Sequence, residues 1–201
     1  MKIDKLHILQ KIQKEKIPFE VIKSAFWLKN EVYVKHFGAN SIAINRDEIK
    51  RDFESGNKER GIIRTLAWGY PNAMRRFRPT MQNITLIAQL LKHKNELNLA
   101  ELYFAFGALM QIEGIGPSTV TKLLFFNGNT FNKTPCLILD EKVINSIKVF
   151  ADFELLRKDL NPYKVGIYIN YLERMQEMAT SFNITPEQLE VYLFDQNGKS
   201  I

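Results

Sequence analysis

The sequence predicts an all-α protein. Apolar residues recur at three- and four-residue spacing through nearly every segment of the 201 residues, which is typical of helices with one buried face. Capping residues and Gly or Pro punctuation divide these segments into about nine or ten helices. A strand fits only at 32–34 or 41–44. A chain of this length buries a real core, as one domain or as two small lobes that share a cleft.

The N-terminal half contains five expected helices, at residues 3–14, 17–29, 45–53, 58–68 and 81–94. The side chain of Asn45 is suited to capping the third of them. The fourth ends at the Trp-Gly-Tyr-Pro stretch 68–71, because Gly and Pro interrupt a helix. A basic connection that contains proline is expected at 71–80.

The C-terminal half contains five more expected helices, at residues 98–112, 118–127, 140–150, 162–180 and 186–194. Asn98 and Asp140 are expected N-caps, and Thr185 opens the last helix. Pro162 suits the first position of the long helix, where a missing amide costs nothing. Residues 127–135 are rich in Asn, Gly and Thr, which indicates a loop.

The net charge of +6 is unevenly distributed. Residues 1–100 carry 19 Lys and Arg against 10 Asp and Glu, whereas residues 101–201 carry 9 against 12. Within the first half, residues 56–94 hold eight basic side chains and one acid. Such a basic band is typical of a nucleic-acid-binding protein, although a solvated face explains it equally well.

Several classes of protein and site are excluded or disfavoured by composition. One cysteine, Cys136, excludes an internal disulfide and any four-cysteine cluster. The three histidines, at 7, 36 and 93, lack the spacing of zinc ligands, so we expect no metal site. No apolar run approaches the roughly 18–20 residues of a membrane span. We therefore expect a cytoplasmic monomer that does not contact a membrane.

The main functional signal is a hairpin at residues 109–126. Gly114 and Gly116 permit a tight turn, Ile115 between them can pack inward, and Pro117 suits the start of the next helix. Free amides at a helix start attract anions. We therefore expect the turn, with Ser118 and Thr119 beside it, to hold a phosphate of the DNA backbone. The alternative is an ordinary turn whose glycines serve geometry alone.

This pattern resembles the helix-hairpin-helix DNA glycosylase superfamily, in which an apolar stretch ending in a helix-starting aspartate follows the hairpin. Here residues 136–143 fit that stretch, and Asp140 lies 24 residues beyond Gly116. The resemblance covers residues 98–150. Together, 68–71 and 114–126 are similar to small bacterial proteins described as 8-oxoguanine-glycosylase-like. The resemblance implies two helical lobes around a cleft, within a single unit over 1–201. Its central lobe spans about 45–150, and residues 1–44 and 151–201 pack around it.

The resemblance also implies an activity on double-stranded DNA. Such enzymes flip a damaged base, here an oxidised purine such as 8-oxoguanine, into the cleft and cut its N-glycosidic bond. Asp140 would stabilise the positive charge that develops on the sugar, in base-excision repair. The alternative for Asp140 is a plain helix N-cap. The alternative for the whole chain is a non-catalytic helix-hairpin-helix module that only binds DNA.

Members that also nick the strand carry a lysine two residues after the second hairpin glycine, and this lysine forms a Schiff base. Ser118 occupies that position here. Lys122 lies one helical turn further along the same face, so we consider it as the nucleophile for an AP-lyase step. A phosphate-anchoring or merely solvated lysine is the alternative. Adenine-removing members also have serine there, but they carry a four-cysteine cluster that this chain lacks.

Aromatic and basic side chains lie together in sequence before the hairpin. Trp68 and Tyr70 are suited to stacking on an extruded base or filling its gap, with phosphates held by Arg75, Arg76 and Arg78. A core tryptophan beside solvated arginines is the alternative. Hairpin carbonyls of this motif can hold a monovalent cation, and we expect no other cofactor.

Overall fold

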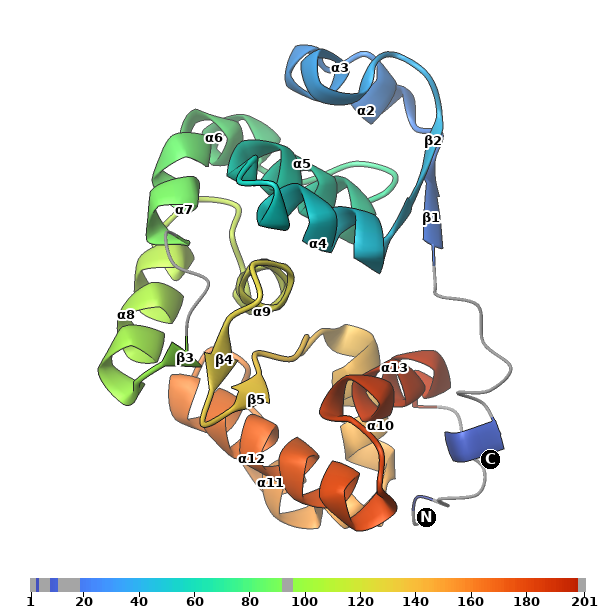
Figure 1. The fold of residues 1–201 in the computed structure, drawn as a ribbon, viewed down its shortest axis with the longest axis vertical. Helices are drawn as coiled ribbons and strands as arrows, with labels where there is room; N and C mark the ends of the chain where they lie inside the picture. The colour runs from blue at the N-terminus through green and yellow to red at the C-terminus, as the bar shows by residue number, and fades with distance from the viewer. Residues whose placement is uncertain (1–2, 4–7, 11–18, 92–95, 199–201) are drawn as a thin grey trace.

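The computed structural model describes residues 3, 8–10, 19–91 and 96–198. Helices predominate in this part of the chain, which confirms the prediction of a mostly helical fold (Figure 1). The helices are α2 (Ala25–Leu28), α3 (Glu31–Phe37), α4 (Arg46–Glu54), α5 (Lys58–Gly69), α6 (Phe77–Gln82), α7 (Ile84–Leu90), α8 (Leu99–Met110), α9 (Pro117–Phe126), α10 (Glu141–Val149), the 3-10 helix η1 (Ala151–Phe153), α11 (Glu154–Lys158), α12 (Val165–Phe182) and α13 (Pro186–Gln196). The predicted helix 3–14 and residues 92–94 lie largely outside the described residues.

Capping side chains begin the helices where the sequence predicts them. The Asn45 side chain accepts a hydrogen bond from the Glu48 amide at 2.9 Å, and the Glu48 carboxylate accepts one from the Asn45 amide at 2.9 Å. The same reciprocal box begins α8 at Asn98 and α13 at Thr185. Two otherwise unpaired amides are satisfied at each helix start, and the predicted caps are confirmed.

The prediction of one helix over 17–29 is wrong for residues 19–22. These residues form strand β1 (Phe19–Ile22), which pairs antiparallel with β2 (Ile42–Asn45) from Phe19↔Asn45 to Ile22↔Ile42. The predicted strand at 41–44 is thus confirmed, and the one at 32–34 is wrong because those residues lie in α3. A segment of four residues is too short to distinguish a helical period from a strand period, and only the pairing with the partner strand decides it.

Other differences arise where short elements interrupt the sequence pattern. The connection 71–80 already contains the start of α6, and the predicted helix 81–94 breaks at Asn83 between α6 and α7. The loop 127–135 contains strands β4 (Thr130–Phe131) and β5 (Thr134–Pro135), and β4 also pairs with β3 (Glu96–Leu97). Pro162 precedes α12 instead of opening it, since α12 begins at Val165. The described residues therefore contain more helices than predicted.

Helix α9 lies in the middle of the molecule (Figure 1), and it contacts α4, α5 and α8. Every residue from Thr119 to Phe126 is buried. This stretch of α9 therefore has no solvated face, as is typical of a helix within a core. Among the described residues, no helix is both long and apolar enough to cross a bilayer. The division into a central lobe over about 45–150 with flanking helices, and the cleft between lobes, remain predictions.

Candidate functional site

The hairpin of the sequence joins α8 to α9 in a turn over residues 111–116. Ile112 and Ile115 are both buried, so Ile115 packs inward as expected. The Ile115 amide donates to the Ile112 carbonyl at 3.0 Å. Gly114 has a φ of +94°, which favours glycine because a side chain there is strained. The turn is therefore held from within by two isoleucines and one obligatory glycine.

The two glycines of the turn have different surroundings. A Cβ atom on Gly114 would overlap the Thr80 hydroxyl oxygen and lie 3.0 Å from the Arg76 carbonyl oxygen. A Cβ atom on Gly116 would meet no atom within 4 Å, and the φ of Gly116 is an ordinary −103°. Gly114 is thus required by the fold, whereas the space above Gly116 is open to an approaching ligand.

The start of α9 has the features of an anion site. Gly116 is the N-cap and no side chain caps the helix. Within the described part of the chain, the amides of Gly116 and Ser118 have no backbone acceptor, whereas those of Thr119 and Val120 donate to the Gly116 carbonyl. Unpaired amides and the positive end of the helix dipole favour an anion here. The Thr119 side chain is buried, and its hydroxyl is hydrogen-bonded to the Tyr70 hydroxyl at 2.8 Å.

Lys122 and Asp140 form a buried ion pair just beyond this helix start. Lys122 Nζ lies 3.2 Å from Asp140 Oδ2, and their side chains are only 9% and 12% exposed. The lysine also donates to the Ser118 hydroxyl at 2.6 Å. Lys142 and Val143 donate their amides to Asp140 Oδ1 at 3.1 and 3.2 Å, so the same carboxylate caps α10. Each carboxylate oxygen thus has its own contacts.

Burial controls the proton affinity of Lys122. Removal from water lowers the pKa of the amine below its ordinary value, since the charged form loses hydration, while contact with Asp140 opposes the fall. Glu190 also raises this pKa, and Arg46 lowers it. A lysine with a lowered pKa holds more neutral amine near pH 7 than an exposed one, and the neutral amine is the nucleophilic form.

A second buried ion pair, which was not predicted from the sequence, joins α4 to α13. The Arg46 guanidinium contacts Glu190 through two hydrogen bonds of 2.6 and 2.9 Å. Burial alone would lower the pKa of Arg46, but Glu190 raises it above its ordinary value. The guanidinium lies over the rings of Trp68 at 5.6 Å and Phe125 at 5.3 Å. Because the partners are 144 residues apart, no local pattern marks the pair.

Trp68 lies in the core. Its ring stacks on Phe194 with centroids 6.4 Å apart and meets Phe126 edge to face at 5.5 Å. The buried indole N–H has no hydrogen-bond partner among the described residues. Next to it in the chain, Gly69 leaves room for the Lys122 side chain, whose Cδ lies 3.5 Å from where a Cβ would stand. The structure thus packs Trp68 against Phe126, on the same helix as Lys122.

The predicted arginines lie beside the hairpin turn and are exposed. Arg76 pairs with Glu113 at 2.8 Å, and Thr80 donates its hydroxyl to the carbonyls of Arg76 and Glu113 at 2.9 and 3.0 Å. Arg75 and Arg78 are exposed on either side of the buried Phe77. The segment 70–80 therefore reaches the helix start twice, through Tyr70 at Thr119 and through Thr80 at Glu113.

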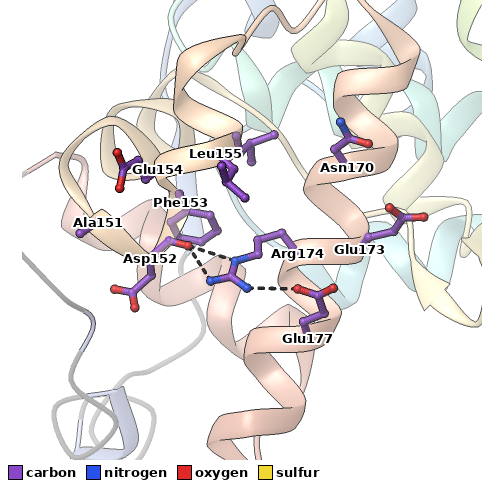
Figure 2. Close-up of a pocket in the computed structure, with 10 residues that line it drawn as sticks. Ala151, Asp152, Phe153, Glu154, Leu155, Asn170, Glu173, Arg174 and Glu177 are labelled. Carbon is purple, nitrogen blue, oxygen red and sulfur yellow. Dashed lines mark hydrogen bonds and ion pairs between the residues drawn. The ribbon is translucent and has the colours of Figure 1, made fainter.

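No group of three or more His, Cys, Asp or Glu side chains in the described ranges is arranged to hold a metal ion. A monovalent cation at the hairpin carbonyls remains a prediction. A surface pocket of about 450 Å³ opens elsewhere, between η1, α11 and α12 (Figure 2). Its described lining includes four carboxylates, of Asp152, Glu154, Glu173 and Glu177, and none of the predicted site residues. Although Arg174 also lines this pocket and pairs with Glu177, the net charge of the lining is negative and disfavours phosphates.

The fold is mostly helical, and its candidate site contains a buried contact between a lysine of the central helix α9 and the aspartate that caps α10. A model of the family described as "Putative 8-oxoguanine DNA glycosylase OGG-like protein" matches residues 11–194. Because the match spans most of the 201 residues, the chain belongs to this family. No curated protein and no solved structure matches the chain.

Proposed function

We propose that this protein is a DNA glycosylase that removes a damaged base, an oxidised purine such as 8-oxoguanine, from duplex DNA. The observation that carries the proposal is the buried contact of 3.2 Å between Lys122 Nζ and Asp140 Oδ2. A module that only binds DNA needs a phosphate site but no buried amine–carboxylate pair. Membership of the OGG-like family supports the same class of activity.

Binding would begin at the helix-hairpin-helix turn. A backbone phosphate would enter the open space above Gly116 and accept hydrogen bonds from the amides of Gly116 and Ser118, for which the described residues offer no backbone acceptor. These contacts ignore sequence and fix only the position of the duplex. Arg75, Arg76 and Arg78, exposed beside the turn, extend the contact to neighbouring phosphates. The extruded nucleotide then has to reach Lys122 and Asp140, which lie within the same helix and at the next helix start.

The chemistry would divide between the two partners. The neutral Lys122 amine attacks the sugar C1′ atom, and the base leaves with the electron pair of the C1′–N bond. Asp140 stabilises the positive charge that develops on the sugar and takes up the proton that the amine loses. Ser118 accepts a hydrogen bond from the amine at 2.6 Å and so orients it. The C1′–O4′ bond of the sugar ring then breaks, O4′ takes up a proton, and C1′ and the lysine nitrogen form a Schiff base, from which strand cleavage follows.

The test is to incubate duplexes that contain different lesions with the protein and to score abasic sites and borohydride-trapped adducts. We expect wild-type protein to form a covalent adduct with an abasic duplex and Lys122→Ala to form none. Lys142→Ala is the matched control, because Lys142 is an exposed lysine two residues beyond Asp140, and it should form the adduct as wild type does.

An adduct that persists in Lys122→Ala would exclude Lys122 as the nucleophile. DNA binding without processing of any lesion would instead favour the non-catalytic helix-hairpin-helix module. Base excision without an adduct would leave a glycosylase that lacks the lyase step.

The three exposed arginines give a separate prediction about affinity. Each of Arg75→Ala, Arg76→Ala and Arg78→Ala should reduce the slope of log K against log salt by about 0.9, because one phosphate contact is lost. Arg157→Ala, which removes an arginine from the acidic C-terminal half, is the control and should leave the slope unchanged. An unchanged slope in the three variants would remove the segment from the DNA interface.

A further inference from the structure

The Arg46–Glu190 pair has no part in the chemistry proposed above, although it is buried in the protein interior. Glu190 is 0% exposed and Arg46 is 6% exposed. The two contacts of 2.6 and 2.9 Å form a bidentate fork, which is the strongest geometry for this pair. It connects the first residue of α4 to the middle of α13. A pair built with this precision is a candidate for a specific role.

Stability alone explains the pair poorly. Desolvation of two charges costs several kcal/mol per ion, and well-packed apolar residues often serve as well or better in the same place. The surroundings are aromatic, with Trp68 and Phe125 on the guanidinium and Phe126 beside Trp68. An apolar pair would therefore fit this core, and the reason for the two charges has to be sought among their neighbours.

Both residues beneath the guanidinium belong to the elements that surround Lys122. Phe125 lies on α9 three residues after Lys122, on the neighbouring turn. Trp68 precedes Gly69, and a Cβ atom at Gly69 would lie 3.5 Å from Lys122 Cδ, so the lysine side chain passes close to this residue. On the other side, α13 packs against α10, where the Ser146 hydroxyl donates to the Leu193 carbonyl at 2.6 Å. Arg46 and Glu190 thus connect the surroundings of the lysine with the helix that Asp140 caps.

The four charges also act on one another. Glu190 raises the pKa of Lys122 and Arg46 lowers it, and the influence of Glu190 is the larger. Asp140 contributes to the raised pKa of Arg46. The other titratable groups nearby are Glu187 on α13, which pairs with Lys50, and Tyr168 and Tyr171 on α12. Both tyrosines stay neutral, since burial raises the pKa of each well above 10.

We propose that Arg46 and Glu190 are positioning residues that set how Lys122 and Asp140 share a proton, by placing one charge of each sign beside that pair. The inference rests on the proposed function of Lys122 as the nucleophile. Removing Glu190 lowers the pKa of the Lys122 amine, and removing Arg46 raises it as long as Glu190, whose own pKa is raised by burial, stays ionised. If the pair served only to hold α4 against α13, removal of Arg46 and removal of Glu190 would not change the pKa of Lys122 in opposite directions.

The titration of Lys122 tests the proposal without DNA. In protein labelled with ¹³C-lysine, the Cε signal that disappears in Lys122→Arg is followed against pH by NMR. We expect Glu190→Gln to lower the titration midpoint by on the order of one pH unit, and Arg46→Gln to raise it by a similar amount. Lys50→Gln and Glu187→Gln are matched controls, because that pair joins the same two helices but is 31% and 40% exposed. They should leave the midpoint unchanged.

Adduct formation with an abasic duplex should follow the titration. At pH 7 the trapping rate should rise by up to about tenfold in Glu190→Gln and fall by up to about tenfold in Arg46→Gln, since one pH unit changes the neutral fraction about tenfold. Midpoints that stay at the wild-type value, or that move in the same direction in both variants, would overturn the proposal. Absence of an adduct in wild-type protein would contradict only the assignment of Lys122 as the nucleophile, because the midpoints are measured separately.

An uncompensated buried charge can prevent folding, so a swapped pair completes the test. Arg46→Glu combined with Glu190→Arg keeps the charges paired and exchanges their positions. Because Glu190 has the larger influence on Lys122, the exchange should lower the midpoint below that of wild type. A folded swapped variant with the wild-type midpoint would show that the pair is a structural clamp.

Discussion

The Asp140→Asn variant is expected to bind duplex DNA as tightly as wild type and to lose base excision by about 10²- to 10⁴-fold. The substitution separates the two uses of this side chain. Asn keeps the Oδ1 acceptor for the amides of Lys142 and Val143, and Asn caps helices as well as Asp does. Only the charge and the oxygen that faces Lys122 are lost.

The expected loss cannot be assigned to a protonated amine. Asp140 raises the pKa of Lys122, so its removal lowers that pKa further and leaves more neutral amine at pH 7. A lower rate in spite of more nucleophile would identify the carboxylate as a catalytic group, which stabilises the charged sugar or takes up the proton of the amine. The measurement is single-turnover release of the damaged base from the lesion that wild-type protein processes.

Asp140→Ala provides the comparison. It removes the cap as well as the charge and should cost roughly a further 1 kcal/mol of folding free energy, with no further loss of excision in the folded fraction. Full activity in Asp140→Asn would leave Asp140 as a helix cap and refute its catalytic assignment. Loss of DNA binding would show instead that the variant disturbs the hairpin.

The sequence predicted the parts of this site that depend on local spacing. Lys122 follows Ser118 by four residues, which places both on one helix face, and the structure brings their polar atoms to 2.6 Å. The apolar run before Asp140 indicated a buried helix start, and residues 137–139 are indeed buried. The caps at Asn45 and Asn98 were predictable for the same reason, because a cap is a contact between residues that are close in sequence.

What the sequence did not predict depends on contacts between distant segments. In the sequence, Glu190 is indistinguishable from the other acidic residues of an amphipathic helix, and only the fold places it against Arg46. Trp68 lies next to arginines in sequence but packs on Phe194, 126 residues away in the numbering. Strand β1 is decided by its pairing with β2. In each case a tertiary contact supplies the free energy that stabilises the observed structure, and this contribution overrides local propensity.

The second large effect is expected from the two glycines of the hairpin. Substitution of Gly114 should reduce the stability of the fold, whereas the same substitution of Gly116 should reduce affinity for DNA. Gly114→Ala is expected to lower the free energy of unfolding by about 2–4 kcal/mol. Its φ of +94° is strained for alanine, and the new Cβ would overlap the Thr80 hydroxyl oxygen. Thermal unfolding should therefore shift down by roughly 5 °C or more for a chain of this size.

Gly116→Ala is expected to change stability by no more than about 1 kcal/mol, since a poorer N-cap is offset by a less flexible unfolded chain. The φ of −103° suits alanine and no atom lies within 4 Å of the new Cβ. That Cβ would instead occupy the space through which a phosphate approaches the amides of Gly116 and Ser118. Affinity for duplex DNA should fall about tenfold, which corresponds to about 1.4 kcal/mol.

The pair of variants therefore separates folding from binding within one turn. Gly114→Ala should reduce binding only as far as it unfolds the protein, and the remaining folded fraction should bind normally at low temperature. Gly116→Ala should bind weakly at every temperature at which it is folded. Wild-type affinity in folded Gly116→Ala would mean that the phosphate does not dock at this helix start. Water would then be the hydrogen-bond partner of the unpaired amides at the start of α9.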